Sequence, residues 1–375
     1  MNSKEAFKPA LIGGIELKNR FVRSATSDPI AENNAPSQEI INKYEKLCEG
    51  ELGLIIMGYL VFSKTDHYSE KDLSMNNDTI SGFKKVTDMA HNYGTKIVAQ
   101  LNHNSTQLFF KPEGNVYGPS EYTDPVSGIM ATAFSKEQIH ELIKEYGQAA
   151  ACAKDAGFDG VQLHAAHGYM LNKFLSPVFN KRTDEYGGDL ERRMQIVIDI
   201  LREIKNVCGS DFPVGIKLNS SDFDSEDKGV NEADFLVISE NLSLKGINSI
   251  EVSGGTLAGV YSFSRAKKHS AYHFASAKRL SEIITTSVIL VGGLRDVDEI
   301  ETILNDTNIA AVSLSRPLIR ELDLVKRWMN GDRSKAKCVA CNGCFNHKGV
   351  QCFFTLSKEE QDVQRPVMKM MQSNN

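Results

Sequence analysis

The sequence lacks long apolar runs and blocks of one charge. No apolar run approaches the roughly 18 residues that a membrane-spanning helix needs, and MNSKEAFKPALIGG at the beginning has no apolar segment of signal-peptide length. No basic block or basic stripe interleaved with aromatic residues occurs, and the net charge is −5. These absences exclude a membrane protein and make nucleic acid an unexpected partner. We therefore expect a cytoplasmic protein.

Repeats, low-complexity segments and a glycine-rich dinucleotide motif are also missing. No G-x-G-x-x-G follows the first apolar run, which disfavours a doubly wound nucleotide-binding fold. The 375 residues are 41% hydrophobic, which is enough for a large buried core. The seven cysteines, without a secretory signal, indicate a reducing intracellular setting.

Short apolar runs alternate with longer amphipathic segments along the chain. Runs such as LIIM, KIVAQL and VILV are continuous, as is typical of strands buried on both faces of a parallel sheet. We predict strands at residues 21–25, 54–57, 96–101, 160–164, 213–218, 247–252, 288–291 and 310–314. We predict helices at residues 38–48, 79–92, 135–157, 191–207, 232–242, 274–284, 297–305 and 319–329, with Ser135 as an N-cap. This α/β alternation predicts a (β/α)8 TIM barrel over residues 1–330, followed by a short cysteine-rich C-terminal extension over residues 331–375.

The stretch HAAHGYMLNKFLSPVFNKRTDEYGGDLERR begins at His164, where the fourth predicted strand ends. It carries too many polar groups for a simple linker and too little periodicity for a helix. Active sites of TIM barrels lie at the C-terminal ends of the strands, on the loops that follow them. We therefore expect this stretch to be a long functional loop.

Two glycines and a serine–arginine pair follow the last two predicted strands. Gly292 and Gly293 come after the seventh strand, and Ser315 and Arg316 come after the eighth. Glycine lets backbone N–H groups approach an anion, and arginine adds a bidentate clamp. Ordinary turns with a surface arginine are the alternative, but the coincidence of both features on these loops favours a phosphate site.

Gln100 and Lys217 stand at or near the ends of the third and fifth predicted strands. A flavin ring needs hydrogen-bond partners along its pyrimidine edge and a cation near N1 and the O2 carbonyl. Glutamine supplies a donor and an acceptor, and lysine supplies the charge. The alternative is that both are ordinary rim residues.

His164 and His167 have three interpretations: metal ligands, core or capping residues, or donors to a substrate oxygen. No carboxylate or cysteine completes a metal set nearby at a recognisable spacing, so we assign no metal here. Two imidazoles can both donate to one carbonyl oxygen and polarise a conjugated alkene. Tyr169 is then a candidate general acid, although a loop tyrosine more often serves in packing.

The histidine-containing block resembles the signature of the Old Yellow Enzyme family of FMN-dependent ene-reductases. NRFVRSATS, GLIIM, QLNH, VGGL and SLSRPLI extend the resemblance over most of the barrel. It implies noncovalent FMN, reduction by NADH or NADPH, and hydride transfer from flavin N5 to the β-carbon of a small α,β-unsaturated carbonyl compound.

The resemblance also implies roles for individual residues. The loop after the first strand would pass along the flavin, Tyr59 would touch it through its backbone, and Gln100 would bind its pyrimidine edge. His164 and His167 would bind the substrate oxygen, and Tyr169 would protonate the α-carbon. Lys217 replaces the usual arginine, and Ser27 replaces threonine or cysteine. The remaining flavin-binding and phosphate-binding positions would be Ser24, Ala25, Thr26, Gly292, Gly293, Ser315 and Arg316.

Four cysteines crowd into the tail with the spacing C-x2-C-x2-C-x7-C, at Cys338, Cys341, Cys344 and Cys352. Such spacing is typical of iron–sulfur or zinc sites, and the CxxCNxxC setting resembles dienoyl-CoA reductases. An iron–sulfur cluster, a zinc knuckle including His347, and free thiols all remain open, so we assign no metal. The alternative functions are an FMN subunit of a larger electron-transfer system and a non-redox barrel that binds a phosphate ligand. A homo-oligomer is compatible with the sequence.

Overall fold

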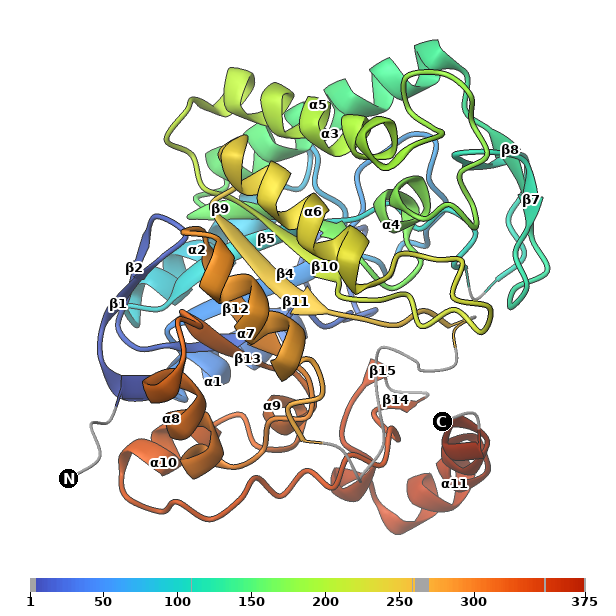
Figure 1. The fold of residues 1–375 in the computed structure, drawn as a ribbon. Coiled ribbons are helices and arrows are strands. Elements are labelled where there is room, and N and C mark those ends of the chain that lie inside the picture. The colour runs from blue at the N-terminus through green and yellow to red at the C-terminus, as the bar shows by residue number, and fades with distance from the viewer. Residues whose placement is uncertain (1–4, 109, 258, 260–269, 347–348, 374–375) are drawn as a thin grey trace.

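Eight parallel strands close into a barrel at the centre of the molecule (Figure 1). The computed structural model describes residues 5–373 except 109, 258, 260–269 and 347–348. The last barrel strand pairs with the first, through Val312 and Phe21, so the sheet has no free edge. The prediction of a TIM barrel with eight strands is confirmed. The barrel strands are β3 (Phe21–Arg23), β4 (Leu54–Leu60), β5 (Lys96–Leu101), β9 (Gly160–Ala165), β10 (Val214–Asn219), β11 (Ser249–Ser253), β12 (Ser287–Val291) and β13 (Ala311–Leu314).

Helices surround the barrel and cover its outer face (Figure 1). Seven of them agree with the predicted segments to within two residues at each end. The prediction of one helix over residues 319–329 is wrong, because the chain breaks into two short helices around Glu321. That residue is buried and extended, and its carboxylate pairs with Arg327 at 3.2 Å. The helices are α1 (Gln38–Glu49), α2 (Ile80–Asn92), α3 (Lys136–Asp155), α5 (Leu190–Cys208), α6 (Glu232–Leu244), α7 (Phe274–Ile283), α8 (Val297–Asp306), α9 (Arg316–Arg320) and α10 (Leu324–Met329).

An N-terminal hairpin of β1 (Ala10–Ile12) and β2 (Ile15–Leu17) closes the bottom of the barrel. Its buried residues Ile12, Ile15 and Leu17 pack with inward-facing residues of several barrel strands, among them Val22 and Ile56. Apolar side chains thus fill the N-terminal end of the barrel, and polar chemistry is left to the opposite end.

The stretch after β9 contains a short helix, α4 (Met170–Leu175), contrary to the expectation of a loop without helical structure. All six of its residues are buried, so it has no polar face. A helix needs such a face to show the 3.6-residue period in a sequence. The short elements β6 (Val116–Gly118), β7 (Tyr122–Thr123) and β8 (Met130–Ala133), which form a small sheet, were not predicted either.

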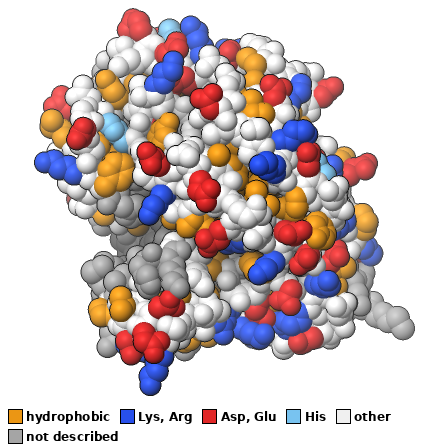
Figure 2. Space-filling model, turned by 180° about the vertical axis from the view of Figure 1, so that it is seen from behind, with side chains coloured by type: hydrophobic (Ala, Val, Ile, Leu, Met, Phe, Trp, Pro, Cys, Tyr) orange, Lys and Arg blue, Asp and Glu red, His pale blue; other side chains and the backbone are white. Residues whose placement is uncertain are grey.

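The segment after α10 contains a two-stranded hairpin of β14 (Phe345–Asn346) and β15 (Gly349–Val350), and then α11 (Lys358–Ser373). Figure 1 shows this segment beside the barrel, near α9. Acidic and basic side chains are interspersed over the face shown in Figure 2. Within the described part of the chain, no helix combines the length and the apolar character that a membrane span requires.

Ser135 begins α3 with a capping box, as its predicted role as an N-cap suggests. Its hydroxyl accepts a hydrogen bond from the backbone N–H of Gln138, and the Gln138 side chain accepts one from the backbone N–H of Ser135. We expect Ser135→Ala to lower the free energy of unfolding by about 1 kcal/mol. Chemical denaturation followed by circular dichroism measures this change. Ser135→Asp keeps a capping oxygen and should stay near wild type; equal losses in both variants would contradict the capping account.

Candidate active site

Polar side chains from five parts of the barrel meet near the C-terminal ends of the strands. Glu251 of β11 is fully buried and stands opposite Lys217 of β10 in the strand register. Gln100 of β5 and Gln162 of β9 are also register partners. Ser24 follows β3 directly. The strands β5, β9, β10 and β11 are consecutive neighbours in the barrel, and hydrogen bonds join these side chains into one polar layer above the apolar bottom.

The polar layer is a continuous chain of hydrogen bonds. Gln100 Nε2 donates to Gln162 Oε1 at 2.7 Å, and Gln162 Nε2 donates to Glu251 Oε2 at 3.0 Å. Lys217 Nζ lies 3.2 Å from Glu251 Oε2 and donates to Ser24 Oγ at 2.8 Å. Ser24 Oγ donates to Glu251 Oε1 at 2.8 Å. The structure thus brings Ser24, Gln100 and Lys217 together through Gln162 and Glu251, which sequence reasoning missed.

His164, His167 and Tyr169 form a second group beside this layer. The ring of His164 lies 5.2 Å from that of His167 and 4.6 Å from that of Tyr169, between centroids. His164 stands opposite Lys217 in the register of β9 and β10. Within the described residues, the buried Nδ1 of His164 has no hydrogen-bond partner. A ring nitrogen that is buried in this way is suited to a ligand atom, because an unsatisfied buried polar group is costly.

Local structure fixes the position of His167. Its backbone has a φ of 63°, and its N–H donates to Asn219 Oδ1 at 3.1 Å. Its Nε2 lies 2.7 Å from Ser253 Oγ. A side chain held at both its backbone and its ring loses little freedom when a ligand binds.

Burial keeps all three of these side chains uncharged. It lowers the pKa of His164 well below its usual value, and the nearby Lys217 charge acts in the same direction. Burial, with His164 second, also lowers the pKa of His167 well below its usual value. Burial raises the pKa of Tyr169 to about 12. At neutral pH the site therefore holds two neutral imidazoles and a protonated phenol.

Tyr59, which follows Gly58 in β4, lies against Tyr169. Their ring centroids are 5.5 Å apart with an interplanar angle of 54°. Burial raises the pKa of Tyr59 well above its usual value, with Tyr169 the next cause. The structure thus places the Tyr59 side chain against the group of His164, His167 and Tyr169, where only a backbone role was expected.

The predicted phosphate residues lie on adjoining loops. Thr26 Oγ1 lies 3.1 Å from Ser315 Oγ and donates to the Ser24 carbonyl at 3.1 Å. Gly292 and Gly293 have positive φ values of 116° and 77°. A side-chain carbon on Gly292 would come within 2.5 Å of the Tyr272 ring. Only glycine fits there, as expected where a backbone must make a close approach.

The other residues predicted for these loops are Arg316, Ala25 and Ser27. Arg316 donates a hydrogen bond to Asn342 Oδ1 in the tail. Ala25 and Ser27 are half-buried in the segment that follows β3. Arg316, at the start of α9, is thus joined to the tail.

A cavity of about 170 Å³ lies next to Gly168. Its wall carries a buried ion pair, in which Lys173 Nζ lies 3.1 Å from Asp124 Oδ2. Because these two charges pair with each other, the cavity is suited to a neutral or weakly polar group. Other lining residues are Thr106, Gln107, Phe179 and Thr256.

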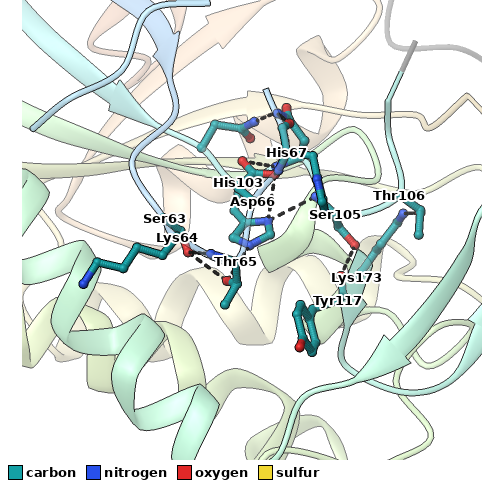
Figure 3. A network of polar contacts seen from close by, with 12 residues as sticks. Ser63, Lys64, Thr65, Asp66, His67, His103, Ser105, Thr106, Tyr117 and Lys173 are labelled. Atoms are coloured by element: carbon teal, nitrogen blue, oxygen red, sulfur yellow. Dashed lines mark hydrogen bonds and ion pairs between the residues drawn. The ribbon is translucent and has the colours of Figure 1, made fainter. Parts of the chain in front are cut away.

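A separate polar network stabilises the loops that follow β4 and β5 (Figure 3). Ser105 N–H donates to His103 Nδ1 at 3.1 Å, so the ring proton of His103 lies on Nε2, 3.2 Å from Thr65 Oγ1. Asp66 accepts backbone hydrogen bonds from His67 and Asn104, both at 2.9 Å. Burial lowers the pKa of His103 to about 3 and raises the pKa of Asp66 well above its usual value. This network fixes the loops in place, and sequence reasoning assigned it no role.

One of the tail cysteines contacts the end of α9. Arg320 Nη1 lies 3.7 Å from Cys352 Sγ. Burial, with the neighbouring thiols of Cys338, Cys341 and Cys352 next, raises the pKa of Cys344 to about 12. Among the residues that the structure describes, no three histidine, cysteine or acidic side chains converge as a metal site, and His347 lies outside them.

A model of the NADH:flavin oxidoreductase / NADH oxidase family matches residues 5–334. The NADPH dehydrogenase of Bacillus subtilis is 30% identical over 326 residues, which cover 85% of this chain and 92% of that protein. A metal reductase of Desulforamulus reducens is 28% identical over 354 residues, which cover 92% of this chain and 52% of that protein. The chain thus spans about half the length of that relative, and 54% of an NADH oxidase from Thermoanaerobacter brockii.

Solved structures show the same fold. A complex of 2-naphthoyl-CoA reductase with 2-naphthoyl-CoA superposes with a TM-score of 0.86 at 22% identity, over 97% of this chain and 58% of that one. Morphinone reductase in complex with tetrahydroNAD gives a TM-score of 0.72 at 22% identity, over 87% and 91%. The resemblance inferred from the sequence is confirmed: the chain belongs to the NADH:flavin oxidoreductase / NADH oxidase family.

Proposed function

We propose that this chain is an FMN-dependent enzyme that passes a hydride from NADH or NADPH to the activated C=C bond of a small α,β-unsaturated carbonyl compound. The observation that carries the proposal is the meeting of Lys217 and Gln100 with a neutral histidine pair at one end of the barrel. Bound FMN supplies the ring that accepts and then gives up the hydride. We place the catalytic unit in residues 1–330, with residues 331–375 as an appended tail.

The residues fit FMN in two respects. The buried polar layer offers an ammonium and an amide for a flavin pyrimidine edge, from Lys217 and Gln100. For the phosphate, the chain offers the hydroxyls of Thr26 and Ser315, the guanidinium of Arg316 and the open backbone at Gly292 and Gly293. Ala25 and Ser27 supply the half-buried backbone between them.

The substrate would meet the histidine pair. A neutral imidazole can donate one N–H, so His164 and His167 together can hold a carbonyl oxygen and polarise the conjugated alkene. His164 Nδ1 is buried without a partner in the described chain, and a substrate oxygen can satisfy it. The remainder of the substrate would bind in the cavity beside Gly168.

Tyr169 would then supply a proton to the α-carbon. Its ring packs edge-on against His164, at an interplanar angle of 83°. With its pKa raised to about 12 by burial, the phenol keeps its proton throughout the neutral range.

The first test concerns FMN itself. Purified protein should be yellow and release FMN on denaturation. Arg316→Ala should weaken FMN binding by about 10- to 100-fold, because it removes a charge-assisted hydrogen bond worth about 1.5–3 kcal/mol. Fluorescence titration of the apoprotein measures the dissociation constant. Arg320→Ala is the matched control, since Arg320 also contacts the tail. A colourless protein that cannot be reconstituted would contradict the proposal and favour a non-redox barrel.

The second test separates the two half-reactions. Tyr169→Phe should slow alkene reduction by about 10²- to 10⁴-fold, because it removes the general acid. Reduction by NADH or NADPH should change little. Anaerobic stopped-flow absorbance measures both rates, with 2-cyclohexenone as the alkene. An equal fall in both half-reactions would show that Tyr169 is not the acid.

The third test concerns pH. The raised pKa of Tyr169 keeps the acid protonated, and the lowered pKa of each histidine keeps both imidazoles neutral. The rate of alkene reduction should therefore stay flat between about pH 6 and 9, since the phenol and both imidazoles keep their protonation states there. It should fall only as pH approaches the pKa of Tyr169. A rate constant that drops through pH 7 would contradict this assignment.

A further inference from the structure

The carboxylate of Glu251 receives three hydrogen-bond donors and offers none in return. Ser24 Oγ donates to Oε1, and Gln162 Nε2 and Lys217 Nζ approach Oε2 at 3.0 and 3.2 Å. The side chain is fully buried. An ionised carboxylate can only accept hydrogen bonds, so this surrounding set of donors matches the charged form.

We propose that Glu251 is a positioning residue that fixes the hydrogen-bond direction of the whole polar layer, and thereby the pattern of donors and acceptors offered to the cofactor. This inference rests on the proposed function, because it concerns how the chain would recognise FMN. No motif in the sequence points to Glu251, which lies inside a strand.

On one side, Glu251 determines the direction in which the Ser24 hydroxyl donates its hydrogen. The Ser24 hydroxyl has a single hydrogen, and it is directed to Glu251 Oε1 at 2.8 Å. The oxygen of Ser24 is left to accept from Lys217 Nζ, also at 2.8 Å. Lys217 then uses two of its three N–H donors within the layer, and one is left for a ligand.

On the other side, Glu251 determines the orientation of two amides. Because the carboxylate accepts, Gln162 must turn its NH₂ group toward Glu251 and its oxygen toward Gln100. Gln100 must in turn donate its NH₂ group to Gln162, at 2.7 Å. The Gln100 oxygen is therefore turned away from Gln162, where it can meet a ligand as an acceptor.

The layer thus offers an acceptor from β5 and a donor from β10, one on each side of β9. The complementary ligand edge has an N–H group beside a carbonyl or an imine nitrogen. The pyrimidine edge of a flavin, with N3–H beside O2 and N1, has this pattern. A Gln100 amide turned the other way would place its NH₂ group against N3–H, where two donors repel.

Glu251 also offsets the charge of Lys217. The ammonium and the carboxylate are both buried, so their interaction is weakly screened. Removing the carboxylate while keeping Lys217 makes the layer more positive. A more positive layer stabilises the anionic reduced flavin, so the midpoint potential of bound FMN should rise.

Glu251→Gln tests both consequences with a residue of the same shape. The two-electron midpoint potential should rise by about 30 mV, which corresponds to a tenfold change in the equilibrium between oxidised and reduced flavin. Wild-type protein should bind N3-methyl-FMN at least about tenfold more weakly than FMN, since one hydrogen bond is lost. In Glu251→Gln this penalty should shrink several-fold, because Gln100 is free to turn.

Gln162→Met is the second variant, because it interrupts the chain to Gln100 but keeps the Lys217–Glu251 ion pair. It should lose discrimination against N3-methyl-FMN while its midpoint potential stays near wild type. Glu301→Gln removes another buried carboxylate, on α8, which accepts from the backbone N–H of Ala6 at 3.3 Å. This control should keep wild-type values in both measurements. Spectroelectrochemical titration gives the potentials, and fluorescence titration gives the affinities.

The outcomes are distinguishable. If wild-type protein binds FMN, and folded Glu251→Gln and Gln162→Met show the wild-type penalty and potential, the inference is wrong and the proposed function stands. If wild-type protein binds no FMN, the proposed function is wrong and the inference fails with it. The inference is supported if the midpoint potential rises in Glu251→Gln alone and the weaker binding of N3-methyl-FMN relative to FMN is reduced in both Glu251→Gln and Gln162→Met.

Discussion

The site depends on one buried ion pair between Lys217 and Glu251, placed inside a barrel whose N-terminal end is filled with apolar side chains. Removing two charges from water is expensive, and their mutual attraction offsets the cost only when further hydrogen bonds satisfy both groups. Ser24 and Gln162 supply those bonds, and Gln100 extends them to a fourth strand, β5. The pair therefore joins five parts of the barrel through side chains, in addition to the backbone ladder.

The lysine of this ion pair also affects His164, beside which lie His167 and Tyr169. The Lys217 charge adds to burial in lowering the pKa of His164, so the imidazole stays neutral and can donate one hydrogen bond. Burial acts in the opposite sense on Tyr169 and raises its pKa. Burial thus holds two bases and one acid in their uncharged forms. Such a set can polarise a carbonyl and deliver a proton while the buried ion pair of Lys217 and Glu251 stays intact.

The strands could be predicted because continuous apolar runs are visible in a sequence, and candidate site residues could be chosen because strand ends carry the chemistry of this fold. Glu251 and Gln162 could not be found in this way. A single polar residue inside an apolar strand does not reveal whether it faces the barrel interior, or which residue it meets across the barrel. Helix α4 was missed because it is buried on every side. Helices α9 and α10 were merged because the sequence does not reveal the extended backbone at Glu321, whose carboxylate pairs with Arg327.

Nuclear magnetic resonance of the protein loaded with nitrogen-labelled FMN would test the central claim most directly, namely that the polar layer receives the pyrimidine edge of the ring. The account predicts an N3–H proton that is shifted downfield and protected from exchange with water, together with an N1 shift typical of a hydrogen-bonded nitrogen. Rapid exchange of N3–H, with N1 at its value for FMN in water, would contradict it.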